Sequence, residues 1–124
     1  PEMILKLSDM MSYMLYDCKH EQVNLSAEVN YLRNYIALQQ LKKEGEFNIE
    51  FQVKGNIEGT LITPMLFIPL FENAFKHGVE RLVEDAYIHM SLVGDEKEVI
   101  FTIENNCEPT DDGRISSQFN HQSK

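Results

Sequence analysis

The sequence predicts an α+β fold: a two-layer α/β sandwich, with helices on one side of a mainly antiparallel sheet, preceded by a long bundle-type helix. Two N-terminal segments, 2–16 and 25–43, carry apolar residues every three or four positions, which is the helical period. A third helical segment, 64–77, follows later. Three segments alternate apolar and polar residues, as half-buried strands do: 47–54, 86–93 and 98–105.

Composition limits the size of the core and the class of partner. With 124 residues, 43% of them hydrophobic, the chain has room for one modest core. The net charge is −9, with acids spread throughout and no basic stripe, so we expect no nucleic-acid or anionic-membrane binding by bulk electrostatics. Cys18 and Cys107 lack zinc-like or CxxC spacing, so we expect two reduced thiols, as in a cytosolic protein; a disulfide between them stays open.

The ends of the chain suggest part of a longer protein. No stretch approaches the ~20 apolar residues that span a bilayer, and no signal peptide is present. Because the first residue is proline, we expect a piece of a longer protein, although processing could also remove an initiator. Any membrane segment is then expected outside this chain.

The first helix carries an apolar seam of the kind found in bundles and coiled coils. Its members step by three and four: Ile4, Leu7, Met11, Met14 and Cys18. Four further apolar residues widen the seam, so we expect the helix to contact more than one neighbour: Met3, Leu5, Met10 and Leu15. A methionine-rich stripe favours adaptable packing over a ligand role. Because this chain supplies no partner helix for the seam, we expect self-association into a homodimer.

The second helix has start and stop signals. Ser26 is the expected N-cap, and Glu28 lies favourably near the positive end of the helix. The helix runs to about Lys43, and Gly45 ends it.

The strands are separated by turn residues. Gly55 and Gly59 bracket a turn, and Leu61–Ile62 can add a brief extended piece. Residues 94–97 join the last two strands into a hairpin. After Asn106 the alternation dissolves, and we expect a mobile loop or disorder.

The third helix begins with Thr63 as N-cap and Pro64 at the first helical position. Pro69 is expected to kink it, because proline removes a backbone donor. Gly78 is a suitable C-cap.

One face of this helix gathers four polar groups. At 3.6 residues per turn, Glu72 lies beside Lys76, and Asn73 lies beside His77. Apolar residues fill the opposite side: Leu66, Phe67, Leu70, Phe71, Ala74 and Phe75. The four polar groups form a plausible cradle for a metal–phosphate ligand. The alternative is the solvated face of an ordinary amphipathic helix.

The string FENAFKHG at 71–78 resembles the N-box of GHKL-type ATP-binding domains, especially those of LytS/YehU-type sensor histidine kinases. Two upstream segments follow the order of the same family: KLSDMMSYMLYD at 6–17 and VNLSAEVNYLRNYIALQQLK at 23–42. The resemblance implies the GHKL (Bergerat) fold, truncated at its C-terminus. It implies that 1–45 is the helical tail of the dimerisation and histidine-kinase region, and 46–124 the N-terminal part of the ATP-binding domain with a partial lid.

The resemblance also implies roles for the polar face. Asn73 would coordinate Mg²⁺, and Glu72 would order or deprotonate a water or polarise the attacking group. Lys76 and His77 would face the ATP phosphates and offset their charge. The alternatives are a Glu72–Lys76 ion pair and an interaction of His77 with the helix dipole.

The adenine-binding motif of the family departs from its usual form here. Asn105 stands where the family has a carboxylate that recognises the adenine amino group, and Cys107 stands where it has the first glycine. An amide oxygen accepts a hydrogen bond more weakly than a carboxylate, so nucleotide affinity is in doubt. Asn106 and Glu104 are alternative candidates.

Two further family elements are missing from the sequence. The second glycine-rich motif would lie beyond Lys124, and the phosphoacceptor histidine would lie before Pro1. In the family this histidine lies in an HFLFN-like sequence. None of the four histidines of this chain does: His20, His77, His89 and His121. We therefore expect this chain alone to be catalytically silent, and ATP hydrolysis or autophosphorylation above an Asn73→Ala control would refute that.

The resemblance implies part of the cytoplasmic kinase core of a two-component sensor histidine kinase. Such a protein uses ATP and Mg²⁺ to phosphorylate its own histidine, and a response regulator is its partner. The first alternative is a non-catalytic, degenerate ATPase-like module for dimerisation and interaction. A small GHKL-like ATPase of another branch, such as an anti-sigma-factor-type kinase, fits the upstream helices less well.

Overall fold

The structure is a computed structural model that describes residues 2–42, 47–78, 85–95, 97–106 and, for the backbone only, 114–122. The chain divides into two compact units, each made of two stretches of sequence. The first unit comprises Pro1–Glu44 and Ile57–Phe67, and the second comprises Gly45–Asn56 and Ile68–Lys124.

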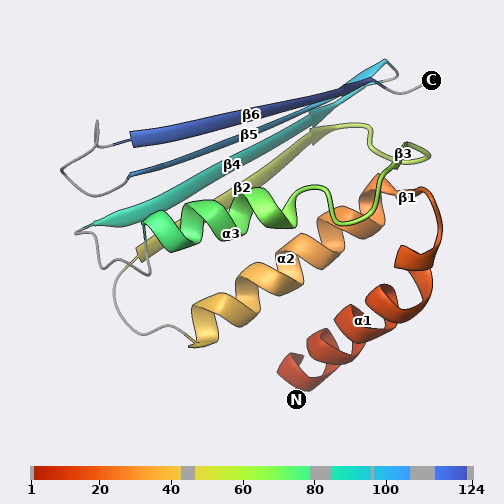
Figure 1. The fold of residues 1–124 in the computed structure, drawn as a ribbon, viewed down its shortest axis with the longest axis horizontal. Coiled ribbons are helices and arrows are strands. Elements are labelled where there is room, and N and C mark those ends of the chain that lie inside the picture. The colour runs from red at the N-terminus through yellow and green to blue at the C-terminus, as the bar shows by residue number, and fades with distance from the viewer. Residues whose placement is uncertain (1, 43–46, 79–84, 96, 107–113, 123–124) are drawn as a thin grey trace. The chain divides into compact units, whose positions relative to one another are not determined.

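The first unit is built on two helices, α1 (Glu2–Tyr16) and α2 (Leu25–Lys42), which lie side by side (Figure 1). A short 3-10 helix, η1 (Asp17–Lys19), follows α1. Strand β1 (Val23–Asn24) pairs antiparallel with β3 (Leu61–Ile62), so both predicted helices and the brief extended piece are confirmed.

The start of α2 differs from the expectation. Helix α2 begins at Leu25, so Ser26 lies inside its first turn, and the prediction of Ser26 as N-cap is wrong. The reason is that the Leu25 N–H donates to the Thr60 carbonyl at 2.8 Å. The backbone beside β1 and β3 thus satisfies a donor at the helix start, where an isolated helix would need a side-chain cap.

Helix α1 contacts α2 beside the predicted seam, on the side that Met10 widens. The buried residues of α1 are Met10 and Tyr13, and the Tyr13 ring lies 5.1 Å from that of Tyr31 on α2. Four seam residues are 46–65% exposed: Ile4, Leu7, Met11 and Met14. The seam therefore faces away from α2 and is left uncovered within this unit.

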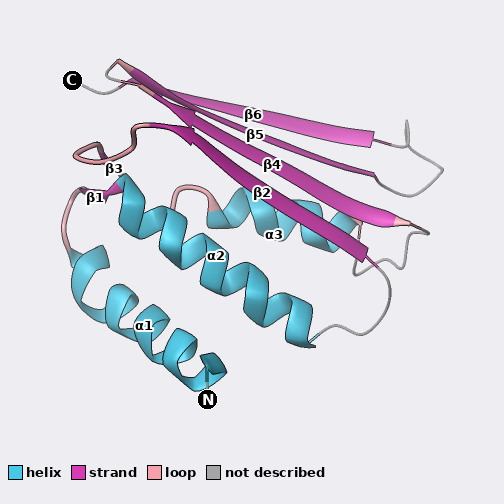
Figure 2. Cartoon of the chain, turned by 180° about the vertical axis from the view of Figure 1, so that it is seen from behind, coloured by secondary structure: helices cyan, strands magenta, loops and turns pink. Residues whose placement is uncertain are grey.

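The second unit is a four-stranded sheet with one helix, α3 (Ile68–His77) (Figure 2). The strands are β2 (Phe47–Gly55), β4 (Ala86–Gly94), β5 (Glu98–Asn106) and β6 (Arg114–Gln122). Their order is β2-β4-β5-β6, with β2 parallel to β4 and the other two pairs antiparallel. The mixed α/β fold and the three expected strands are confirmed.

Strand β6 corrects the expectation of a loop or disorder after Asn106. It pairs with β5 from Asn106↔Arg114 to Glu98↔Gln122. Its sequence is mostly polar, so apolar alternation gave a weak signal. The backbone N–H and C=O groups along the edge of β5 pair with β6, and this pairing requires no particular side-chain pattern. Residues 107–113, which include Cys107, lie outside the described part of the chain.

The core of the second unit lies between α3 and one face of the sheet. Phe71, Ala74 and Phe75 are buried on α3, and Phe75 meets Phe47 edge to face at 6.2 Å. The sheet contributes alternate residues of β4 and β5: Ile88, Met90, Leu92, Val99, Phe101 and Ile103. Full burial of each large apolar side chain contributes about 1.5–3 kcal/mol, which fixes the face that α3 turns toward solvent.

Helix α3 starts later than predicted. It begins at Ile68, so neither Thr63 nor Pro64 starts it, and Met65 has a left-handed φ of 58° that interrupts a helical path. Pro69 is consequently the second helical residue. In the first turn its missing N–H would have no helical partner anyway, so the predicted kink is wrong.

Gly78 follows α3 directly, as predicted, and its N–H donates to the Ala74 carbonyl at 3.0 Å. Its role is not a left-handed cap, because the positive-φ glycines of the described chain are Gly55 and Gly59. A Cβ at Gly78 would lie 3.1 Å from the Asn106 carbonyl oxygen. Glycine therefore permits a close approach between the end of α3 and the end of β5.

No helix among the described residues combines the length and the apolar character that crossing a bilayer requires.

Candidate functional site

The four predicted polar residues of α3 share its solvent-facing side. Glu72, Asn73 and Lys76 are exposed, and His77, the last helical residue, is partly exposed. They lie opposite the buried Phe71, Ala74 and Phe75. The polar face is thus held in place by a core that prevents the helix from rotating about its axis, and Asn73 is available to a ligand.

Two basic side chains lie at the C-terminal end of this face. Lys76 and His77 occupy the last turn of α3, where cations also interact well with the negative end of the helix dipole. The helix dipole therefore accounts for part of their placement. Glu72 stands one turn before Lys76 on the same face and brings a carboxylate beside the amide of Asn73.

These side chains fit a hard divalent cation bound together with phosphates. The oxygens of Asn73 and Glu72 are ligands that Mg²⁺ accepts, and Mg²⁺ usually keeps several waters and takes few protein ligands. In the described part of the chain, no group of three or more His, Cys, Asp or Glu residues could hold a metal by itself. A cation here would therefore depend on its phosphate partner.

Asn105 is buried next to the end of α3. It is 2% exposed on β5 and follows Phe101 and Ile103 in the alternation of the covered sheet face. Its Nδ2 lies 3.6 Å from the position of a Cβ on Gly78 and donates to the Asn106 carbonyl at 2.8 Å. The fold thereby brings a strand residue that is 28 positions away in sequence beside the end of the polar helix face.

The two alternatives to Asn105 lie on the other side of the sheet. Asn106 accepts from the Tyr87 N–H at 3.0 Å through Oδ1, and it donates to the Asp85 carbonyl at 3.1 Å through Nδ2. It thus holds the start of β4 to the end of β5. Glu104 accepts from the Tyr87 hydroxyl at 3.4 Å. Both side chains serve contacts on the face away from α3, so Asn105 is the candidate that faces the helix.

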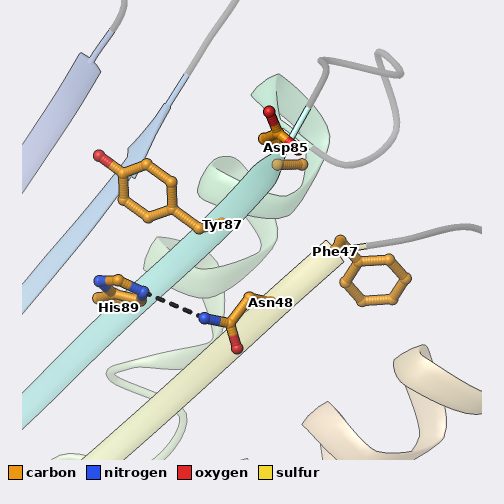
Figure 3. Close-up of a pocket in the computed structure, with 6 residues that line it drawn as sticks. Phe47, Asn48, Asp85, Tyr87 and His89 are labelled. Carbon is orange, nitrogen blue, oxygen red and sulfur yellow. Dashed lines mark hydrogen bonds between the residues drawn. The ribbon is translucent and has the colours of Figure 1, made fainter.

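A hollow of about 420 Å³ near the same end of the sheet was not anticipated from the sequence (Figure 3). Its described lining is Phe47, Asn48, Asp85, Ala86, Tyr87 and His89. The His89 Nε2 pairs with the Glu50 carboxylate at 2.9 Å, and the Tyr87 and His89 rings lie 4.7 Å apart. Alternation placed Tyr87 and His89 on the polar face, but only the β2–β4 register sets Glu50 opposite His89. None of the four polar α3 residues lines this hollow.

Comparison with known proteins finds sequence similarity to histidine kinases. The model of the family described as histidine kinase matches residues 1–47. The sensor protein LytS of Staphylococcus haemolyticus (strain JCSC1435) is 25% identical over 114 residues, which cover 92% of this chain and 20% of that protein. The sensor histidine kinase/phosphatase LytS of Staphylococcus aureus (strain MRSA252) is 30% identical over 92 residues, covering 74% of this chain and 16% of that protein.

A solved structure shares the fold. The histidine kinase ThkA, in its crystal structure with the response regulator protein TrrA, aligns with a TM-score of 0.53 at 8% identity and covers 98% of this chain and 48% of that chain. The chain spans a fifth or less of the length of these two LytS relatives. The family model and the two relatives support a LytS-type histidine kinase fragment. The ThkA structure supports the fold alone.

Proposed function

We propose that this chain is part of the cytoplasmic kinase core of a two-component sensor histidine kinase and binds ATP with Mg²⁺ for autophosphorylation of a histidine. The observation that carries the proposal is the exposed polar face of α3, which ends beside the buried Asn105. A carboxylate, an amide and two basic groups on one fixed face suit a metal–phosphate ligand. In this proposal, residues 1–45 belong to the dimerisation and histidine-kinase region, and residues 46–124 belong to the ATP-binding domain. The proposal includes no nucleic-acid partner.

In this proposal each residue of the polar face has one role. The Asn73 amide oxygen binds the cation, which when bound neutralises charge on the phosphates. Glu72 orders or deprotonates a water beside it, or polarises the attacking group. Lys76 and His77 lie against the phosphates and offset the charge that develops during phosphoryl transfer. Because α3 is held by its buried aromatic side, these groups need little reorganisation when the ligand binds.

In the same proposal, Asn105 accepts a hydrogen bond from the adenine amino group. Its side-chain oxygen provides a neutral acceptor, and a neutral hydrogen bond is about half as strong as one to a carboxylate. We therefore expect weaker nucleotide binding than in a domain that has an acid here. Replacing Asn105 by Asp is expected to strengthen it.

The partners follow from the surfaces of the chain and from its relatives. The exposed seam of α1 supports a homodimer, because a second copy can bury the four apolar residues that α2 leaves uncovered. The solved structure of ThkA contains a response regulator, which supports a response regulator as the acceptor of the phosphoryl group here. Any membrane attachment would belong to segments outside this chain.

The test is calorimetric titration of the natural full-length protein with ATP in the presence and absence of Mg²⁺. Asn73→Ala is expected to weaken Mg²⁺-dependent binding roughly ten-fold or more, the loss expected for a charge-assisted contact. Asn30→Ala, which changes an exposed asparagine on helix α2, is the matched control and is expected to bind as the parent does. Equal affinity of the Asn73→Ala protein and the parent would contradict the proposal.

A second candidate function rests on Asn105. Its amide is buried and already donates to the Asn106 carbonyl, and it replaces the carboxylate that the family uses for adenine. These features favour a non-catalytic, degenerate ATPase-like module that dimerises and binds a protein partner. Absence of ATP binding in the natural full-length protein, at millimolar nucleotide and Mg²⁺, would favour this candidate.

A further inference from the structure

Glu28 is a buried acid that the proposed kinase chemistry does not use. It is 3% exposed on α2 and is the buried carboxyl group in the described part of the chain. Burying a carboxylate away from water is unfavourable unless donors satisfy its oxygens. The position of Glu28 therefore requires partners, and those partners come from two other segments of the first unit.

Each oxygen of the Glu28 carboxylate has its own donor. The Tyr13 hydroxyl of α1 donates to Oε2, and the Leu66 N–H donates to Oε1 at 3.1 Å. Tyr13 precedes Glu28 by 15 residues, and Leu66 follows it by 38. One side chain thus joins α1, α2 and the segment that leads toward α3.

Tyr13 acts as a donor throughout the physiological pH range. Burial, followed by the hydrogen bond to Glu28, raises the pKa of Tyr13 far above its usual range, so the hydroxyl keeps its proton. The Tyr13 ring is buried and lies 5.1 Å from that of Tyr31, which restricts its movement. A fixed donor on Oε2 restricts rotation of the carboxyl group and so directs Oε1 toward Leu66.

Leu66 follows a backbone turn that needs support. Met65 has a left-handed φ of 58°, a conformation that costs free energy for a residue with a Cβ and persists only where neighbours hold it. The Leu66 N–H belongs to the next peptide unit, so its bond to Glu28 holds this turn. Two residues later α3 begins, at the boundary between the two units of the chain.

We propose that Glu28 is a positioning residue that, through its two hydrogen bonds, couples the placement of α1 at Tyr13 to the backbone turn at Met65–Leu66 ahead of α3. A displacement of α1 that withdraws the Tyr13 hydroxyl frees the carboxyl group to rotate and loosens the turn. The link to catalysis rests on the proposed function, because it assumes that α3 carries the nucleotide-binding groups. The structural coupling itself does not depend on that assumption.

Hydrogen exchange at the Leu66 amide in the natural full-length protein tests the coupling directly. Tyr13→Phe removes one oxygen atom and leaves Glu28 in place, yet it is expected to accelerate exchange at Leu66 roughly ten-fold, the loss of a charge-assisted hydrogen bond. Tyr16→Phe, at an exposed tyrosine of the same helix, is the matched control and is expected to leave Leu66 unchanged. An unchanged Leu66 rate in Tyr13→Phe would overturn the proposal.

A second comparison separates coupling from a general loss of stability. Exchange at Leu32, which is buried within α2, is expected to stay within about two-fold of the parent rate in Tyr13→Phe. Equal acceleration at Leu32 and Leu66 would overturn the proposal. The double variant Tyr13→Phe/Glu28→Gln is expected to exchange at Leu66 no faster than the faster single variant, because both changes break one chain of contacts. Additive acceleration would mean two independent contacts and would contradict it.

Autophosphorylation kinetics give the functional readout. Tyr13→Phe is expected to lower kcat roughly five-fold, because the Met65–Leu66 turn that it loosens leads into α3, the helix that carries the polar face. Asn73→Ala is expected to raise KM. If the parent protein does not bind ATP, the proposed function fails while the exchange comparison at Leu66 still decides the coupling.

Discussion

At the scale of single residues, Glu28 shapes the chemistry of its surroundings. Burial, and next the negative charge of Glu28, raise the pKa of the Cys18 thiol; Asp17 acts in the same direction, and a hydrogen bond from Tyr13 opposes them. Cys18 is a partly buried free thiol. After burial, the carboxylate that holds the Met65–Leu66 turn thus contributes to the raised pKa of Cys18, which makes this cysteine a reporter for the network.

Alkylation of Cys18 is expected to be slower at pH 8 than that of an ordinary thiol and to rise at higher pH, because its pKa is raised and only the thiolate reacts. Glu28→Gln removes the repelling charge, so the pKa of Cys18 is expected to fall and the midpoint of the rate profile to move to lower pH. The measurement is the alkylation rate between pH 7 and 10 in a Cys107→Ser background. Glu21→Gln changes an exposed glutamate and is expected to leave the midpoint of the rate profile unchanged. An unchanged midpoint in the Glu28→Gln variant would refute the electrostatic explanation.

Residue-scale inference from the sequence succeeded where chemistry is local. Asn73 and Lys76 could be placed on one face because helical spacing and an apolar opposite face suffice. Glu28 could not be interpreted, since a glutamate in a first helical turn is usually explained by the helix dipole. Its two donors come from residues 15 and 38 positions away, which no spacing rule connects.

At the scale of elements, the errors lie at boundaries and edges. Helix α3 starts at Ile68 because Pro64 and Met65 form a turn, although proline at a first helical position is a common start signal. Strand β6 was missed because an edge strand can be specified by backbone pairing alone. The β4–β5 hairpin was predicted correctly, because both of its strands alternate and the turn between them is polar.

The turn of this hairpin depends on Asp95. One of its carboxylate oxygens accepts from the N–H groups of Lys97 at 2.7 Å and Glu98 at 2.8 Å, and these bonds lower the pKa of Asp95 below its usual value. A carboxyl group whose pKa is depressed on folding stabilises the protein above its unfolded pKa of about 3.9, and this contribution is lost as the pH falls through the folded pKa.

Asp95→Ala is therefore expected to lower Tm by a few degrees at pH 7 and by progressively less as the pH falls below about 4. The measurement is thermal unfolding of the parent and the variant at matched ionic strength from pH 7 to 3. Asp95→Asn keeps a neutral acceptor and is expected to restore part of the loss, with a difference from the parent that also shrinks in acid. A difference between parent and Asp95→Ala that is constant over this range would contradict the role of the ionised carboxylate.

At the scale of the whole molecule, the candidate site combines a predictable and an unpredictable part. The polar face of α3 follows from 10 residues of local sequence. The family resemblance named Asn105, but its position beside the end of α3 required the fold, because only packing brings Gly78 and the end of β5 together. The seam of α1 shows the same division. Its helical spacing was correct, yet only the structure shows that α2 packs beside it, on the side of Met10.

The uncovered seam leads to the prediction of assembly. Light scattering of the natural full-length protein is expected to show a dimer, because a second α1 can bury the apolar stripe. Leu7→Glu/Met11→Glu places like charges in the paired stripes and is expected to yield monomers, since unpaired charges resist burial there. Leu41→Glu alters a leucine on α2 that is as exposed as Ile4, at 65%, but lies outside the seam, so this control is expected to stay dimeric. A parent protein that remains monomeric at high concentration would mean that no surface joins two copies. A seam variant that still dimerises would mean that another surface joins them.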